Sequence, residues 1–252
     1  MDLPLSTLVA LAVVSTIAGF VDAIAGGGGL LTLPALMMSG LPPSMVLGTN
    51  KGQSVFGSGS ALVRFGRSAL LDRERARQQV LPALVGAVLG VQLVSQISSE
   101  LLRPLVMVLL SAVAVFLLVR RAPVDIGPPR RQPAWVAALV ALIFGTYDGF
   151  FGPGTGTFLI MAYVALWHDR MDAASANAKV VNFSSNLASA VSFALAGLIV
   201  WKVALCMAVG QAVGGHLGAH ITIKQGHGLV RLVVVGISLC LVARMAWQFY
   251  GG

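Results

Sequence analysis

The chain has 252 residues, of which 57% are hydrophobic and only 10% are charged, whereas roughly a quarter of the residues in an ordinary soluble domain carry a charge. This composition predicts an all-α polytopic membrane protein, because apolar segments of about 20 residues, enough to cross a bilayer, occupy nearly the whole chain. It leaves no room for a soluble catalytic domain. The formal net charge of +8 comes from basic residues grouped in a few connections, which indicates contact with a membrane surface and no nucleic acid partner.

Apolar spans of sufficient length follow one another along the chain. We predict them at 3–25, 49–66, 80–97, 101–119, 133–151, 180–200, 203–223 and 229–248. Two further apolar segments, 29–41 and 155–167, have about 13 residues each, which is too short for a comfortable crossing and suits a re-entrant half-helix. An even number of crossings in each half would give both halves the same orientation. We therefore expect about eight transmembrane helices in two homologous four-helix repeats, each with a short re-entrant segment.

Basic residues predict which ends of the spans face the cytoplasm. Arginines crowd the connection 64–77 and again the connection 120–131, and the positive-inside rule makes both connections cytoplasmic. With eight spans, both termini are then expected in the cytoplasm. Lys224 is the exception, since this topology leaves its connection outside. The first residues lack the basic region of a cleaved signal peptide, so the first span is expected to remain in place.

An internal repeat divides the chain into two homologous halves. The segment GFVDAIAGGGGLLTL recurs as GTYDGFFGPGTGTFL, so that Asp22 matches Asp148 and Gly26 matches Gly152 at an offset of 126 residues. The joining segment RRAPVDIGPPRRQP is rich in proline and arginine, which predicts an extended, solvated linker. The predicted units are a first transmembrane repeat at 1–122, a cytoplasmic linker at 123–132 and a second transmembrane repeat at 133–252.

Each repeat contains a glycine-rich stretch inside its apolar sequence, AGGGG in the first and GPGTG in the second. Glycine costs about 1 kcal/mol relative to alanine in a helix and proline about 3 kcal/mol, so both stretches predict helix breaks. Irregular backbone at membrane depth is tolerated where it lines a cavity, and paired breaks point to a transport site. Half-helices that begin after Gly29 and Thr155 would direct N–H groups and a positive dipole end at that site, which favours an anion.

Glycine can instead serve only close helix packing. This alternative is weaker for the two glycine-rich stretches, because four adjacent glycines exceed what a packing face requires. It is the better interpretation for the small-xxx-small positions Gly86, Gly90, Gly210, Gly214 and Gly218.

Polar side chains accompany the breaks. The spans that follow them carry polar stripes at helical spacing, which either line a substrate path or hydrogen-bond between helices. Lys51 and Lys179 are placed near span ends, where they either attract an anion or extend to the membrane interface. The predicted substrate-binding residues are Gly26, Gly27, Gly28, Gly29, Asn50, Lys51, Ser54, Gly152, Pro153, Gly154, Thr155, Asn177, Lys179 and Asn182.

Asp22 and Asp148 lie well inside apolar spans, each four residues before its break. An intramembrane carboxylate is a candidate functional group, and we expect either a proton carrier or an acceptor that holds the broken backbone in place. His216 is a third candidate for proton coupling, because histidine titrates near neutral pH; a packed core histidine is the alternative. The sequence contains no enzyme or metal-binding signature, so no catalytic residue, metal or cofactor is expected.

The segment AGGGGLLTLPALMMSGLPPSMVLGTNK resembles the glycine-rich element of the sulfite exporter TauE/SafE family, also called the 4-toluene sulfonate uptake permease (TSUP) family, and GTYDGFFGPGTGTFL is similar to its second-half signature. The likeness extends over essentially the whole chain. It implies a transporter of sulfur-containing or small organic anions in the bacterial cytoplasmic membrane, driven by the proton gradient and without a cofactor. The glycine-rich elements and the regions of Asn50 and Asn177 would form the binding centre, although the second half reads SANAK where the first reads GTNK.

Two mechanisms fit these expectations. A secondary transporter would bind a small anion between the halves and rock them to alternate access. Alternatively, the breaks form the fixed filter of a channel-like anion pore. An intramembrane enzyme is a third class, but it lacks a visible nucleophile and base. The expected partners are a small anion, protons and the lipid bilayer, with a homodimer left open.

Overall fold

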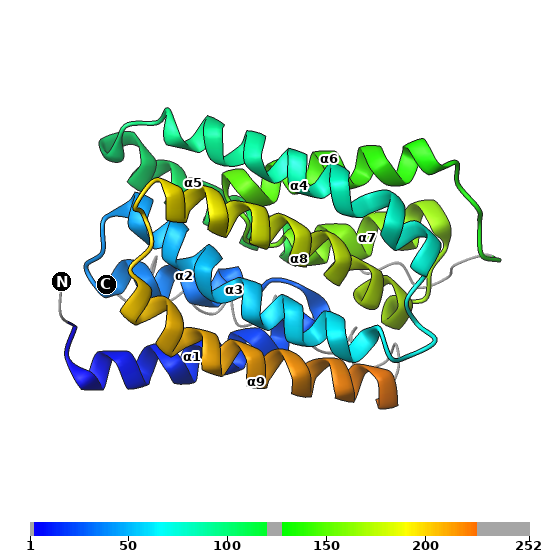
Figure 1. The fold of residues 1–252 in the computed structure, drawn as a ribbon, viewed down its shortest axis with the longest axis horizontal. Helices are drawn as coiled ribbons and strands as arrows, with labels where there is room; N and C mark the ends of the chain where they lie inside the picture. The colour runs from blue at the N-terminus through cyan, green and yellow to red at the C-terminus, as the bar shows by residue number, and fades with distance from the viewer. Residues whose placement is uncertain (1–2, 120–127, 226–252) are drawn as a thin grey trace.

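A computed structural model describes residues 3–119 and 128–225, and the secondary structure in this part of the chain is helical throughout (Figure 1). In chain order the helices are α1 (Leu5–Ala25), α2 (Gly29–Met38), α3 (Pro43–Phe65), α4 (Arg73–Ser95), α5 (Ser99–Val119), α6 (Ala134–Phe150), α7 (Thr155–Trp167), α8 (Met171–Leu195) and α9 (Trp201–Gln225). The expected helical class is confirmed for these residues. The predicted span 229–248 lies outside the described residues, so the total number of crossings stays a prediction.

Several described helices expose large apolar side chains, as expected of helices that face lipid. Among the described helices, α1 and α4 are both long and apolar enough to cross a bilayer. α3 and α8 have 23 and 25 residues, but they carry many polar side chains, which they bury inside the molecule. Large apolar side chains form outward faces, on α1 at Leu5, Val9, Val13 and Ile17 and on α9 at Trp201, Leu205, Val209, Val213 and Leu217.

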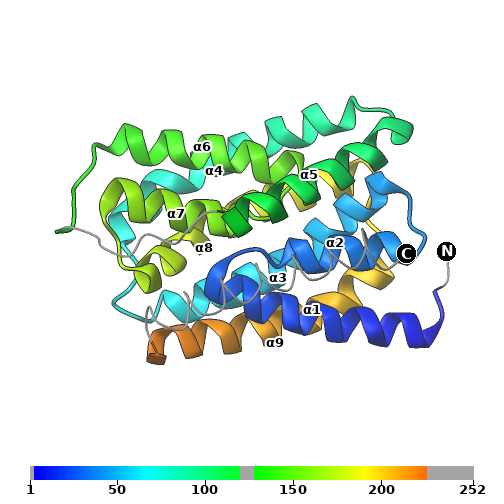
Figure 2. The same ribbon diagram turned by 180° about the vertical axis from the view of Figure 1, so that it is seen from behind.

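Eight of the nine described helices form two groups, and each group includes one helix from the other half of the sequence. α9, from the second half, packs along α1 and α3, and α2 lies beside them. α4, from the first half, packs along α6 and α8, and α7 lies beside them. We call these the first group (α1, α2, α3 and α9) and the second group (α4, α6, α7 and α8). They lie one below the other in Figures 1 and 2 and meet along α3 and α8, so the packed bodies differ from the halves 1–122 and 133–252.

Glycines make the closest helix contacts inside each group. A Cβ atom added to Gly214 of α9 would overlap the carbonyl oxygen of Thr16 in α1, and one added to Gly90 of α4 would overlap that of Thr146 in α6. The packing interpretation is confirmed for every small-xxx-small position, since each of these glycines abuts the backbone of a neighbouring helix: Gly86, Gly90, Gly210, Gly214 and Gly218.

Corresponding helices of the two halves run in opposite directions. Along the contact of α3 with α8, Gly48 lies against Phe193 and Gly59 lies against Phe183, so the two helices are antiparallel. Each of these helices follows the glycine-rich break of its own half. Figure 1 shows the same reversal for the helices before the breaks, because α1 starts at the end where the N-terminus is marked and α6 starts at the opposite end. The expectation of two halves with the same orientation is therefore wrong.

The error has a physical cause in the short helices. α1 runs deep into the bundle, and α2 then returns the chain to the end where α1 began (Figure 2). α6 and α7 form the same kind of hairpin from the other end. Such a hairpin returns the chain to the end where it began, so after α3, α4 and α5 the second half starts from the opposite end of the bundle and is inverted. The segment 29–41, predicted as a re-entrant half-helix, contains the short helix α2, which forms a hairpin with α1.

The start of α1 and the end of α9 also differ from the predicted arrangement. The start of α1 and the basic connection between α3 and α4 lie at opposite ends of the bundle, so they cannot both face the cytoplasm as expected. The end of α9 lies at the basic end, because Arg64 of α3 contacts His220 of α9. Lys224, the exception to the predicted charge distribution, therefore joins the other basic residues.

Candidate functional site

The two glycine-rich stretches interrupt helices at the positions predicted. In the first break, between α1 and α2, Gly26 and Gly27 have φ angles of 69° and 110°. In the second break, between α6 and α7, Gly152 and Gly154 have φ angles of 98° and 83°. Glycine adopts this left-handed region without the steric cost that a Cβ atom imposes, so these stretches end one helix and allow another to start.

The two breaks touch at the centre of the molecule. The backbone of Gly26 lies so close to Gly156 that a Cβ atom on either residue would overlap the other. Thr157 adds two hydrogen bonds, since its hydroxyl donates to the carbonyl oxygens of Ala25 at 2.9 Å and Gly26 at 3.0 Å. α2 and α7 both begin at this meeting point, and the first N–H groups of a helix have no partner within it. Two half-helix N-termini therefore converge on one place.

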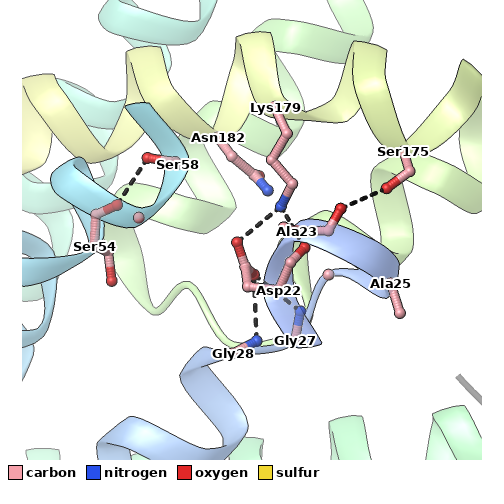
Figure 3. Close-up of polar contacts among 12 residues, drawn as sticks. Asp22, Ala23, Ala25, Gly27, Gly28, Ser54, Ser58, Ser175, Lys179 and Asn182 are labelled. Carbon is pink, nitrogen blue, oxygen red and sulfur yellow. Dashed lines mark hydrogen bonds and ion pairs between the residues drawn. The ribbon is translucent and has the colours of Figure 1, made fainter. Parts of the chain in front are cut away.

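Asp22 holds the first break in shape and pairs with a lysine from the other half of the chain, as Figure 3 shows. Its Oδ1 atom accepts hydrogen bonds from the N–H groups of Gly27 and Gly28, each at 3.2 Å. Its Oδ2 atom lies 2.8 Å from Nζ of Lys179, which also donates to the carbonyl oxygen of Asp22 at 2.5 Å. The structural role considered for Asp22 is thus present in the hydrogen bonds of the break.

Asp148 forms the corresponding pair in the opposite sense. Its Oδ2 atom lies 2.9 Å from Nζ of Lys51 and accepts a hydrogen bond from the hydroxyl of Ser185 at 2.5 Å. Lys51 also donates to Oδ1 of Asn186 at 3.1 Å. The side chains of Lys51 and Asp148 are 3% and 6% exposed. Each group of helices thus contributes one lysine and one carboxylate to the contact between the groups.

The burial of both lysines overturns one interpretation of their position. Lys51 and Lys179 do not extend to the membrane interface, because their side chains are only 3% and 0% exposed. α3 and α8 cross near the breaks, so a lysine eight residues after the start of either helix reaches the middle of the bundle and not its edge. A charged group in such surroundings requires a partner of opposite charge, which the other half supplies.

A cavity of about 30 Å³ lies between the two breaks, with room for about two water molecules. The side chain of Asn182 points into this region, and its buried Oδ1 atom has no hydrogen-bond partner in the described part of the chain. Within the same residues, no group of three His, Cys, Asp or Glu side chains is arranged to hold a metal ion. The predicted residues that line the cavity are Asp22, Gly27, Gly28, Gly29, Asn50, Lys51, Ser54, Asp148, Gly152, Gly154, Thr155 and Asn182.

Five predicted residues do not line the cavity. Gly26 and Pro153 belong to the breaks themselves, where the carbonyl of Pro153 accepts a hydrogen bond from a tyrosine. Lys179 is fully buried on its carboxylate partner. His216 is exposed on α9, away from the cavity, so the structure does not bring it together with the two carboxylates. Asn177 lies in a separate cluster near the start of α8.

That cluster is built around a buried arginine. Arg75 of α4 donates to both carboxylate oxygens of Asp169, at 2.6 and 3.2 Å, and its guanidinium lies 4.8 Å from the ring centre of Trp167. Asn177 accepts a hydrogen bond from the N–H of Asp72 at 2.9 Å and donates to Asp169 at 3.4 Å. These contacts attach α4 to the connection between α7 and α8. They give Asn177 a structural environment instead of the predicted place in the binding centre.

Three cavity residues were not among the predicted site residues: Gly156, Asn186 and Gln211. Asn186 belongs to the polar stripe of its span, and Gly156 adjoins the second break, so both had a signal in the sequence. Gln211 also had one, because it is a polar residue directly after the packing residue Gly210 in an apolar span. A Cβ atom added to Gly57 would overlap its Oε1 atom, so the absence of a side chain there makes room for the amide.

Comparison with known proteins gives matches along nearly the whole chain. The family model described as "Sulfite exporter TauE/SafE" matches residues 11–245. A "Probable membrane transporter protein" of Haemophilus influenzae is 38% identical over 249 residues, which cover 98% of each chain. The "Probable membrane transporter protein ORF9" of Sinorhizobium sp is 36% identical, with 97% of this chain and 94% of the relative covered. For the "Probable membrane transporter protein YfcA" of Escherichia coli strain K12 these values are 34%, 94% and 89%.

No solved structure matches this chain. The family match and the coverage of these relatives confirm the resemblance carried by the two glycine-rich segments. The chain therefore belongs to the sulfite exporter TauE/SafE family of membrane transporters.

Proposed function

We propose that this protein is a secondary transporter that binds a small sulfur oxyanion, such as sulfite or a sulfonate, in the central cavity and moves it by alternating access with protons. The family description supports the substrate class, and the names of the relatives support transport. Their bacterial origin supports a place in the bacterial cytoplasmic membrane. The end of the bundle that carries the connection 64–77 and Lys224 then faces the cytoplasm, and the start of α1 faces outward.

One observation carries the proposal: the cavity lies where two broken helices meet, beside a buried lysine. The starts of α2 and α7 line it, and Nζ of Lys51 is held at its wall by Asp148. Asp22 already binds the N–H groups of Gly27 and Gly28, but the other N–H donors of the half-helix N-termini and their partial positive charge suit the oxygens of an oxyanion. A lysine supplies the full charge that these weaker donors lack.

The size of the cavity favours a carrier over a fixed pore. A volume of about 30 Å³ holds about two water molecules, so a sulfur oxyanion with several oxygens fits only after the breaks move apart. The breaks belong to different groups of helices, since the first lies between α1 and α2 and the second between α6 and α7. Rocking of one group against the other would open the cavity toward one end of the bundle and then toward the other.

Counterflow in proteoliposomes tests the proposal. Purified protein is reconstituted with unlabelled sulfite inside, and the entry of labelled sulfite is measured against thiosulfate, methanesulfonate and acetate as competitors. A carrier shows saturable entry that is accelerated by substrate on the other side. The variant Lys51→Met should lose this exchange, because the cavity then lacks its cation.

The matched control is Lys224→Met, which removes an exposed lysine at the end of α9 and should leave exchange unchanged. Large sustained currents without acceleration by internal anion would replace the carrier with the pore. Absence of saturable exchange for every anion tested would overturn the proposal.

A further inference from the structure

We infer that the two central carboxylates have different tasks: Asp148 takes up the transported proton and releases Lys51 to the anion, whereas Asp22 stays ionised and holds the first break. This inference rests on the proposed function and assigns the coupling step within it. It is carried by the different hydrogen-bond donors that surround the two carboxylates.

The groups around the carboxylate of Asp22 can donate hydrogen bonds but cannot accept them. The N–H groups of Gly27 and Gly28 point at Oδ1 at 3.2 Å, and Nζ of Lys179 lies 2.8 Å from Oδ2. Backbone N–H groups and an ammonium group only donate, so they stabilise a carboxylate and offer nothing to the O–H of a carboxylic acid. Protonation of Asp22 would also leave the break without its acceptor.

The second break cannot surround Asp148 in the same way, for a reason written in the sequence. The repeat places Pro153 where the first half has Gly27, and proline has no N–H to donate. The carboxylate of Asp148 is instead approached by the hydroxyl of Ser185 at 2.5 Å and by Lys51 at 2.9 Å. Because Pro153 lacks an N–H in any arrangement of the helices, this difference between the surroundings of the two carboxylates is present whichever way the transporter is open.

Ser185 can serve either protonation state of Asp148. A hydroxyl is both donor and acceptor, so it donates to the carboxylate and can turn to accept the O–H of the acid. The carbonyl oxygen of Asn182 lies 3.2 Å from the Ser185 hydroxyl and can accept its hydrogen bond when the hydroxyl turns away from Asp148. The O–H of protonated Asp148 thus has an acceptor and the Ser185 hydroxyl keeps one, which is the condition for a group that must change charge inside a protein.

The two lysines differ in the same sense. Lys179 is fully buried and binds Asp22 twice, through the carboxylate and through the carbonyl oxygen at 2.5 Å. Lys51 lines the cavity, and besides Asp148 it contacts the amide oxygen of Asn186 at 3.1 Å. When Asp148 loses its charge, Lys51 is left with a neutral amide and an open side toward the cavity. A monovalent oxyanion can then replace the carboxylate as its partner.

The charges near Asp148 sum to zero, which sets the stoichiometry. Its ion-pair partner is Lys51 from α3, the phenol of Tyr147 is beside it on α6, and Asp22 from α1, paired with Lys179 from α8, lines the same cavity. A proton from water converts the carboxylate of Asp148 to the acid and leaves one excess positive charge, which one monovalent anion neutralises. On the other side the anion leaves, the acid returns its proton to water, and Lys51 pairs with Asp148 again. One proton therefore accompanies each monovalent anion in the same direction.

A pair of substitutions tests the assignment with methanesulfonate, whose charge does not change near neutral pH. Asp148→Asn imitates the protonated state, so in proteoliposomes it should retain counterflow and lose accumulation driven by a pH gradient. Asp22→Asn should yield less folded protein, but the folded fraction should still accumulate the anion in response to the gradient. Accumulation by Asp148→Asn at the wild-type level would overturn the inference, as would loss of gradient-driven accumulation with intact counterflow in Asp22→Asn.

A third variant keeps the test decisive if Asp148→Asn does not fold. Pro153→Gly restores an N–H group to the second break, which should favour the ionised form of Asp148 and shift the pH of half-maximal uptake downward. An unchanged or higher midpoint in folded Pro153→Gly would overturn the inference. Failure of the proposed function has a different signature, because the wild-type protein itself would then show no saturable counterflow.

Discussion

The contacts inside each group of helices differ in kind from the contact between the groups. Inside a group, glycines bring helices together at backbone distance, as Gly214 does with Thr16 and Gly90 with Thr146. Between the groups, such a backbone contact occurs where Gly26 meets Gly156, and two lysine–carboxylate pairs and several hydroxyl groups lie around the cavity beside it. Backbone contacts of the first kind have one arrangement only, whereas charged pairs can exchange one partner for another.

This difference indicates where the molecule can move. The first and second groups should each behave as a rigid body, because a shift inside a group would drive a carbonyl oxygen into a glycine. Separation of the two groups would open the contact of Gly26 with Gly156 and change the partners of Lys51 and Lys179. The bodies that rock in the proposed mechanism are therefore the packed groups, with α4 and α9 exchanged, and not the two sequence halves.

The largest effect is expected from a side chain placed in the contact inside a group. Gly214→Leu should prevent α9 from packing on α1, because even a Cβ atom at this position overlaps the carbonyl of Thr16. We expect loss of a folded, monodisperse protein in detergent, measured by fluorescence-detected size exclusion. Val213→Leu is the control, since Val213 is 49% exposed on the same turn and should leave elution unchanged. Normal elution of Gly214→Leu would show that the contact is not close.

The next effect concerns the arginine that attaches α4 to the second group. Arg75→Met leaves the carboxylate of Asp169, which is 11% exposed, without its partner. Breaking a buried ion pair in this way costs about 3–5 kcal/mol, so a clear decrease in melting temperature is expected. The double variant Arg75→Met/Asp169→Asn should recover part of the loss, because it removes the unpaired charge. A melting temperature equal to wild type in Arg75→Met would show that this cluster does not contribute to the stability of the second group.

The proposed motion predicts that a distance between the two groups changes, whereas a distance inside the first group stays constant. Spin labels at Ile17 and Ile143, 53% and 54% exposed, report on α1 and α6 of different groups; labels at Ile17 and Val213 report within the first group. With Cys206 and Cys240 replaced by serine, saturating sulfite should shift the first distance distribution by a few ångströms and leave the second unchanged. A shift only in the second would place the moving contact inside the group.

The smallest effect is expected at the hydroxyl that joins the two breaks. Thr157→Val keeps the shape of the side chain but removes the donor to the carbonyls of Ala25 and Gly26. The expected loss of stability is about 1–3 kcal/mol, measured by thermal unfolding in detergent. Thr222→Val is the control, because the Thr222 hydroxyl is equally buried but bonds only within its own helix, to Gly218. Equal losses of stability in Thr157→Val and Thr222→Val would show that the hydrogen bonds between the breaks add no stability beyond that of a bond within one helix.

Much of the centre could be predicted from local sequence properties. The stretches AGGGG and GPGTG interrupt helices because glycine and proline disfavour helix wherever they occur, and the small-xxx-small glycines lie at helix contacts for an equally local reason. Asp22 and Asp148 line the cavity as expected of intramembrane carboxylates. These features depend only on residue type and spacing, which can be read directly from the sequence.

The errors arose where a prediction needed the identity of a neighbour. The length of α2 is the same for a re-entrant loop and for the arm of a hairpin, so the orientation of the halves could not follow from it. Asn177 matches Asn50 in the repeat, but only its hydrogen bonds with Asp72 and Asp169 place it in a cluster apart from the cavity. Gln211 is visible as a polar residue in an apolar span, but its place in the cavity depends on the packing of α9 against helices of the other half, which no local pattern predicts.

By itself, the sequence determined that the chain is an apolar helical protein with two matching helix breaks, each preceded by a carboxylate, and that one break carries Pro153 where the other carries Gly27. These are properties of single segments. The tertiary structure alone decided that Lys51 pairs with Asp148 and Lys179 with Asp22, because the antiparallel crossing of α3 and α8 brings each lysine to the break of the other half. Whether a buried charge is stable depends on its ion-pair partner, and in both pairs the partner lies more than ninety residues away in the chain.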